Sequence, residues 1–167
     1  MAVSSDILRT WRAPRAVFRD LLAQGQREDR ALAYLMVGCV LVFVAQWPRL
    51  SRQAFITGTE LDQLIAYEFL SWLIIWPLLF YAISGLSYLV MRLLGLRGGA
   101  YSVRLAMFWA WLSATPLGLF YGLLTGFNGA NAGSYLIGAG WLLAFGWFWL
   151  QGLREARSWM SDAEHAG

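Results

Sequence analysis

Four long apolar stretches alternate with short polar segments along most of the chain. They cover residues 31–47, 64–94, 103–124 and 134–150. A helix needs about 20 apolar residues to cross a hydrocarbon core of about 30 Å. Such a helix also satisfies its own backbone hydrogen bonds in lipid. The pattern therefore predicts an all-α fold, a polytopic transmembrane helical bundle with four spans.

The second stretch is the least regular of the four. Its thirty-one residues are too many for one upright span and too few for two spans with a turn. At about 1.5 Å per residue they would extend about 46 Å. We expect one long helix that kinks near Pro77 and projects beyond the bilayer. Two shorter segments would instead give five spans.

The polar segments set the expected boundaries. Residues 1–30 form an N-terminal segment, residues 31–150 the transmembrane domain, and residues 151–167 a polar tail. Within the transmembrane domain, residues 48–63 are predicted to be a short loop. Residues 95–102 and 126–133 are predicted to be turns rich in glycine.

The arginines predict the orientation. All thirteen basic side chains are arginine, and only Arg49 and Arg52 fall on the side opposite the termini. The other eleven share one side with both ends of the chain. Because cytoplasmic loops retain positive charge, both termini are predicted to be cytoplasmic in a multi-pass protein. The use of arginine without lysine is typical of a GC-rich bacterial genome, which places the protein in an inner membrane.

Composition excludes several classes of protein. Hydrophobic residues make up 59% of the chain and charged residues 14%, whereas soluble domains contain about 25% charged residues. The net charge of +3 does not indicate nucleic-acid binding, because the arginines are dispersed over loops without stacking aromatics. The bilayer is the partner that the composition predicts.

An amphipathic helix is expected within residues 7–22. Pro14 suits the first position of a helix. Four apolar side chains then fall on one face, away from Arg15 and Arg19: Val17, Phe18, Leu21 and Leu22. We expect this helix to lie in the cytoplasmic membrane interface, where arginines meet anionic headgroups. The alternative is a helix packed under the bundle.

The third stretch carries small residues at every fourth position without a break. These are Ala106, Ala110, Ala114, Gly118, Gly122 and Gly126. Small residues at this spacing let a second helix approach closely, which is how helices associate in lipid. We call this set the small-residue ridge. It predicts packing against spans of the same chain or, alternatively, a docking face for another copy or another membrane protein.

The fourth stretch repeats the pattern in two pairs. Ser134 and Gly138 are four residues apart, as are Gly140 and Ala144. We therefore expect the third and fourth spans to pack closely against each other.

One acidic residue and two prolines are the candidates for a polar site. Glu68 is the one acid within an apolar stretch, and intramembrane carboxylates are often functional. Its position near the start of the stretch favours the membrane interface. Pro77 and Pro116 each break a helix, and Pro116 frees the carbonyl of Leu112. Such breaks occur at the binding sites of transporters.

Tryptophans near the ends of the spans are expected to anchor the bundle. They are Trp47, Trp147, Trp149 and Trp159. An indole is half apolar and half polar, which suits the membrane interface.

The residues of familiar active sites are missing. The one histidine, His165, lies in the tail, and the one cysteine, Cys39, lies in an apolar stretch and is expected to be a core residue. No metal cluster, catalytic pair or phosphate-binding loop can be assembled from this inventory. The sequence predicts neither an enzyme nor a cofactor.

Two segments resemble the bacterial branch of the Yip1 family. The first is residues 11–22, a proline-containing polar helix that precedes the bundle. The second is residues 98–106, a glycine turn that leads through Trp109 and Trp111 to a break at residues 114–116. The resemblance implies a multispanning membrane protein without known catalytic activity. Eukaryotic members act in vesicle trafficking and usually have five spans, but their Asp-Leu-Tyr-Gly-Pro signature is absent here, so small-GTPase binding is not implied.

These features together predict a non-enzymatic inner-membrane protein. It would associate with itself or with a larger membrane complex through its small-residue helix faces. The alternative is a small transporter or channel component that uses Glu68 and the helix breaks at Pro77 and Pro116.

Overall fold

The computed structural model describes residues 3–96 and 98–165, with side chains described as far as Trp159. Every regular element in this part of the chain is a helix. Four helical segments are long and apolar enough to cross a membrane: Glu28–Thr57, Leu61–Leu93, Ala100–Asn128 and Ala132–Trp159. This confirms the predicted all-α bundle with four spans. Arg97 and the side chain of His165 lie outside the described part.

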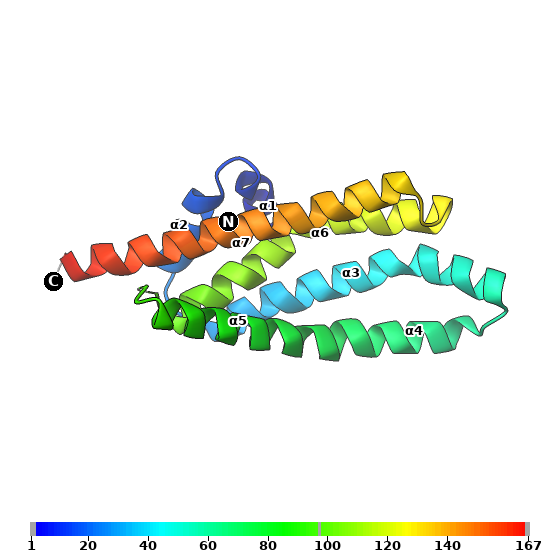
Figure 1. Ribbon diagram of the computed structural model, residues 1–167, viewed down its shortest axis with the longest axis horizontal. Coiled ribbons are helices and arrows are strands. Elements are labelled where there is room, and N and C mark those ends of the chain that lie inside the picture. Colours follow the sequence, from blue (N-terminus) through cyan, green and yellow to red (C-terminus); the bar gives the residue numbers. More distant parts are fainter. Residues whose placement is uncertain (1–2, 97, 166–167) are drawn as a thin grey trace.

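Helix α6 (Ala100–Asn128) is the centre of the bundle. Helix α3 (Glu28–Thr57) packs along one side of it and α7 (Ala132–His165) along another. The segment Leu61–Leu93 contacts α3 with its first half and α6 with its second half. The helices run roughly parallel to the long axis, and the α3–α4 and α6–α7 turns share one end, which we call the far end (Figure 1). The chain termini lie away from it.

Helix α3 is longer than its apolar stretch predicts. It continues through Pro48 to Thr57, so the predicted loop at residues 48–63 is wrong over most of its length. The connection is only residues 58–60. Gly58 ends the helix at φ +69°, and its N–H donates to the carbonyl of Ala54 at 2.9 Å. Polar side chains do not prevent a helix from continuing past its apolar stretch, because the backbone N–H and C=O groups still form their hydrogen bonds within the helix.

The second span is one continuous helical segment, as predicted. It consists of α4 (Leu61–Leu70), a π-helical turn (Ser71–Ile75) and α5 (Trp76–Leu93). The N–H of Trp76 bonds to the carbonyl of Ser71, five residues back. This wider turn directly precedes Pro77, which lacks a donor and occupies the start of α5. The five-span alternative is therefore wrong.

Helices α6 and α7 also exceed their predicted bounds. Helix α6 continues to Asn128, so Gly126 is helical and the predicted turn at residues 126–133 shortens to about residues 129–131. Helix α7 continues beyond residue 150 to His165. The predicted polar tail is thus a helical extension of the last span.

The N-terminal segment forms two helices, α1 (Val3–Thr10) and α2 (Pro14–Ala23). Pro14 begins α2, as predicted. The apolar face of α2 is covered by protein, since Val17 and Phe18 are each 1% exposed. Helix α2 packs against α7, and α1 contacts α6 (Figure 1). The amphipathic helix is therefore present, and its apolar face packs against the bundle, which is the alternative expectation.

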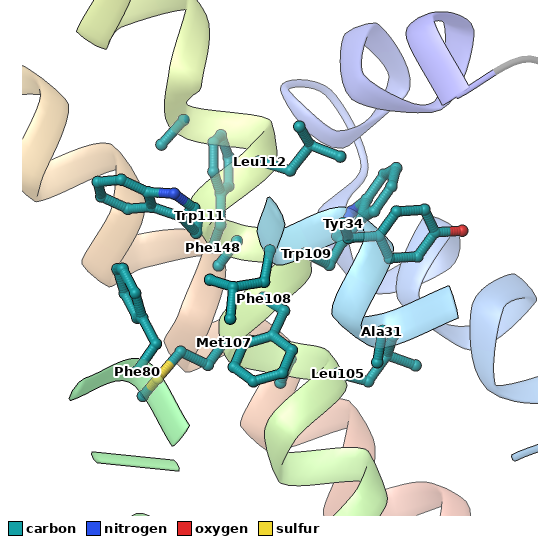
Figure 2. Packing of buried hydrophobic residues seen from close by; sticks show 14 of the residues in the cluster. Ala31, Tyr34, Phe80, Leu105, Met107, Phe108, Trp109, Trp111, Leu112 and Phe148 are labelled. Atoms are coloured by element: carbon teal, nitrogen blue, oxygen red, sulfur yellow. The ribbon is translucent and has the colours of Figure 1, made fainter. Parts of the chain in front are cut away.

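The core lies around the N-terminal half of α6. Leu105, Phe108 and Leu112 of α6 are fully buried. Aromatic rings surround them (Figure 2): Phe80 of α5 lies 4.7 Å from Trp111, and Tyr34 of α3 meets Trp109 edge-on at 4.9 Å. Edge-to-face and offset ring pairs add to the apolar burial. This cluster fixes α3, α5 and α7 on α6.

Candidate functional site

Glu68 lies near the far end of the bundle and is paired. Its carboxylate accepts a hydrogen bond from the Nη2 of Arg49, a residue of α3. The Nε of Arg49 donates to the Oε1 of Gln46 at 2.9 Å. The Glu68 and Arg49 side chains are 23% and 35% exposed. The charge of the one acid within an apolar stretch is therefore neutralised by an opposite charge from the neighbouring span.

A polar pocket of about 310 Å³ adjoins this ion pair between α3 and α4. Besides the pair itself, Gln53, Tyr67 and Ser71 line it. The first residue of the π-helical turn, Ser71, therefore belongs to the site. Turns of this kind occur frequently at functional sites, and Glu68 has access to a polar cavity.

The two predicted helix breaks do not join this site. Neither Pro77 nor Pro116 lines the pocket at Glu68. Near Pro116, the hydroxyl of Thr115 donates to the carbonyl of Trp111 at 3.1 Å. The structure thus brings Glu68 together with an arginine and a π-helical turn, and leaves the prolines as local features of their helices.

The small-residue ridge is filled by helices of the same chain. An ideal Cβ at Gly122 would lie 2.2 Å from the carbonyl oxygen of Ala45, and one at Gly126 would lie 2.3 Å from Pro48. A Cβ at Gly118 would meet the Trp141 ring at 2.8 Å. The three alanines Ala106, Ala110 and Ala114 are at most 1% exposed. The small-residue ridge therefore lets α3 and α7 of the same chain approach α6 closely. This is the expected packing against spans of the same chain.

Three glycines inside the described helices have open space where a side chain would be. A Cβ at Gly85, Gly140 or Gly146 would meet nothing within 4 Å. By contrast, a Cβ at Gly138 would lie 3.0 Å from Tyr121. Of the two predicted pairs on α7, the one that contains Gly138 packs on α6. In the other pair, Ala144 packs against the core cluster, whereas Gly140 has open space beside it.

Glu155 is a buried site that sequence reasoning missed. Its side chain is 1% exposed, and its two carboxylate oxygens accept from the Nε of Arg15 at 3.0 Å and from the Nε of Arg19 at 2.6 Å. Both arginines belong to α2. The signal was present next to it, because Gly152 and Ala156 repeat the four-residue spacing of small residues after Phe148 interrupts it, and Gly152 lies against Ala106. A small residue in the predicted tail indicated that α7 still packs there.

Two tryptophan hydrogen bonds also hold the N-terminal helices to α6. The indole N–H of Trp11 donates to the carbonyl of Ser113 at 3.2 Å. The indole of Trp109 donates to the hydroxyl of Thr10 at 3.1 Å. Together with Glu155, these contacts fix α1 and α2 on the bundle.

The predicted interfacial tryptophans divide into two groups. Trp47 and Trp147 are about half exposed, at 48% and 54%. Trp149 instead stacks on Phe145 with ring centroids 6.0 Å apart, and Trp159 packs against the core cluster. Cys39 is fully buried, as expected for a core residue.

The described residues contain no group of three His, Cys, Asp or Glu side chains that could hold a metal ion. The chain matches no known family model, no curated protein and no solved structure. The function must therefore be argued from the molecule itself, and the resemblance to the Yip1 family stays a prediction.

Proposed function

We propose that the protein is a non-enzymatic, multi-pass protein of a bacterial inner membrane. It associates by helix packing with a second copy of itself or with a larger membrane complex. The contact surface is the outward face of α7 around Gly140. The resemblance to the Yip1 family agrees with this proposal, because eukaryotic members of that family bind one another.

One observation carries the proposal: Gly140 lies open on an apolar helix face. Leu136 and Leu143, four residues before it and three after it, are 73% and 74% exposed, and Trp147 is 54% exposed. These positions share one side of α7 at helical spacing. A glycine between large side chains makes a depression into which a second helix backbone can press. No helix of this chain occupies it.

The cost of such a glycine supports an intermolecular role. Glycine in a helix interior is less favourable than alanine by about 0.5–1 kcal/mol. Close helix contact compensates at Gly118, Gly122 and Gly126, where α3 or α7 fills the space. At Gly140 the chain supplies no such contact. A partner helix would supply it.

The arginines support the proposed orientation. Among the described arginines, the side chains of four make no hydrogen bond or ion pair, and all four lie toward the termini: Arg12, Arg92, Arg154 and Arg157. At the far end, Arg49 is paired with Glu68, and Arg52 donates to the carbonyl of Phe127 at 2.9 Å. Four described arginines without a side-chain partner thus lie at the proposed cytoplasmic side, whereas the far end has one arginine, Arg52, whose charge no described acid neutralises. This distribution agrees with the positive-inside rule.

The test is copurification in mild detergent of a tagged copy with an untagged copy, followed by mass spectrometry. Wild type is expected to bring down the untagged copy or a defined set of membrane proteins. Gly140→Leu is expected to remove that association without unfolding the chain, because nothing lies within 4 Å of an added Cβ. The matched control is Gly85→Leu, the same substitution at an equally open position on α5.

Loss of association in Gly140→Leu but not in Gly85→Leu supports the proposal. If wild type and both variants run as the same monomer, the proposal is wrong. Equal loss in both variants would also contradict it, since that result would mean that leucine disturbs the bundle generally.

A second candidate function is transport of a solute or proton, favoured by the polar pocket that reaches Glu68. The Arg49 ion pair would have to open for Glu68 to change its partner or protonation state. If the protein transports a solute or proton, Glu68→Gln should abolish the flux measured in proteoliposomes. If the protein acts only by helix association, Glu68→Gln should leave copurification of the partner unchanged.

A further inference from the structure

A second pocket lies at the far end, on the other side of α3 from Glu68. Its volume is about 280 Å³, and it lies between α3, α6 and the turn that leads into α7. Arg49 and Arg52 line it, and no carboxylate does. Because Arg49 is already paired with Glu68, Arg52 gives this pocket its net positive charge.

Arg52 is held in place with donor groups to spare. Its Nη1 donates to the carbonyl of Phe127 at 2.9 Å, which fixes the guanidinium beside the turn. A Cβ at Gly129 would lie 3.0 Å from the Nη2 of Arg52, so the glycine leaves room for the charged group. The remaining N–H groups of Arg52 have no other hydrogen-bond partner among the described residues. A planar guanidinium with free donors matches the oxygens of a phosphate.

An apolar pocket of about 350 Å³ lies next to it, nearer the middle of the bundle. Gly138, Trp141 and Leu142 of α7 line it, and no charged side chain does. Tyr121 of α6 lines both pockets. A Cβ at Gly138 would lie 3.0 Å from the Tyr121 ring, so this glycine lets the ring lie close to the backbone of α7.

We propose that these two pockets together bind one anionic phospholipid from the far leaflet. The phosphate lies against Arg52, and an acyl chain follows the apolar pocket past Tyr121 toward Leu142. Charge complementarity selects the headgroup, because the outer pocket has an unneutralised guanidinium and no acid. The order of the pockets also fits a lipid, since the charged one lies at the end of the spans and the apolar one within them.

The experiment is native mass spectrometry of the purified protein after removal of bound lipid. Three probes are added in turn: phosphatidylglycerol, phosphatidylcholine and glycerol phosphate. Phosphatidylglycerol is expected to bind at least several-fold better than phosphatidylcholine, and glycerol phosphate, which lacks acyl chains, is expected to bind far more weakly. No preference for phosphatidylglycerol over phosphatidylcholine, or equal binding of glycerol phosphate, would overturn the proposal.

Variants locate the site. Arg52→Gln is expected to weaken phosphatidylglycerol binding about tenfold, the effect of losing a charge-assisted hydrogen bond, whereas Arg52→Lys keeps much of it. The matched control is Arg92→Gln, which removes the same charge at the other end of the bundle. Equal weakening by Arg52→Gln and Arg92→Gln would mean general electrostatic attraction and would overturn the site.

Arg52→Gln also removes the hydrogen bond to the carbonyl of Phe127, which could alter the α6–α7 turn. A second variant therefore tests the site without changing Arg52. Ala139 is exposed and lines the apolar pocket, so Ala139→Phe fills that pocket without changing any charge. It is expected to weaken phosphatidylglycerol binding severalfold. Unchanged binding in Ala139→Phe would show that the acyl chain lies elsewhere and would contradict the two-pocket site.

Discussion

At the residue scale, single atoms decide how closely two helices approach. Gly122 of α6 faces the backbone of α3 at Ala45, where an added Cβ would lie 2.2 Å from a carbonyl oxygen. A backbone atom cannot rotate away as a side chain can. In lipid, where helices gain no hydrophobic energy by associating, such close contact is a main source of stability.

We expect Gly122→Ala to destabilise the bundle by about 1–3 kcal/mol, the usual cost of overpacking. Gly85→Ala is the matched control, since nothing lies within 4 Å of that position, and alanine is the better helix former. The measurement is thermal unfolding of both variants in detergent. An unchanged unfolding temperature for Gly122→Ala would show that α3 and α6 are farther apart than described.

Charge at the residue scale is handled by pairing. Glu155 is 1% exposed and bonded to two arginines of α2, and Glu68 is bonded to Arg49. A buried carboxylate without a partner would cost several kcal/mol. Each ion pair therefore mainly offsets the cost of burying the carboxylate and adds little net stability. The Glu155 pairs therefore specify where α2 docks, while apolar contacts supply most of the binding energy.

At the element scale, α2 belongs to the bundle. Its apolar face is covered by protein, and its arginines reach Glu155 of α7. The alternative expectation, an apolar face inserted in lipid, would leave that face without protein contacts. Docking of α2 also explains why α7 continues past residue 150, because the extension provides Glu155.

The position of α2 can be tested by hydrogen exchange. Phe18→Ala removes a ring that is 1% exposed, which costs about 3 kcal/mol or more in a protein core, and the backbone amides of α2 should then exchange about a hundredfold faster. Ala16→Ser, on the exposed side of the same helix, should change little. Equal amide exchange rates in the two variants would indicate that the apolar face of α2 is held by lipid and not by the bundle.

At the scale of the whole molecule, the helices are unequally covered. The most apolar windows of α3 and α6 are 50% and 61% buried, whereas those of Leu61–Leu93 and α7 are only 17% buried. Helix α6 is thus the inner helix, and α7 presents most of its surface to lipid or to a partner. The second span is equally exposed, and the partner face is proposed on α7 because Gly140 lies there between exposed large side chains.

Orientation is the property of the whole molecule to measure. With both termini cytoplasmic, Thr59→Cys in the α3–α4 turn should react with a membrane-impermeant maleimide in intact cells, and Ser4→Cys should react only after lysis. The native Cys39 is fully buried and would be replaced by alanine to remove any background. Labelling of Ser4→Cys in intact cells would reverse the proposed topology.

The sequence by itself determined the class of fold and the number of spans. Apolar stretches long enough to cross a bilayer must form helices there, because lipid offers no partner to backbone polar groups. The four spans, the continuous second span and the position of Pro14 at the start of α2 all followed from local pattern. Helix ends did not follow, since α3 and α7 continue through polar residues that hydropathy alone assigns to loop and tail.

Only the tertiary structure decided which residues meet. Spacing identified the ridge on α6 but could not tell whether α3, α7 or another chain fills it, because all three would satisfy the same contacts. The partners of Glu68 and Glu155 come from other helices, and nothing local in the sequence encodes such pairings. The same holds for the two pockets that share Tyr121, because one lies between α3 and α6 and the other between α6 and α7.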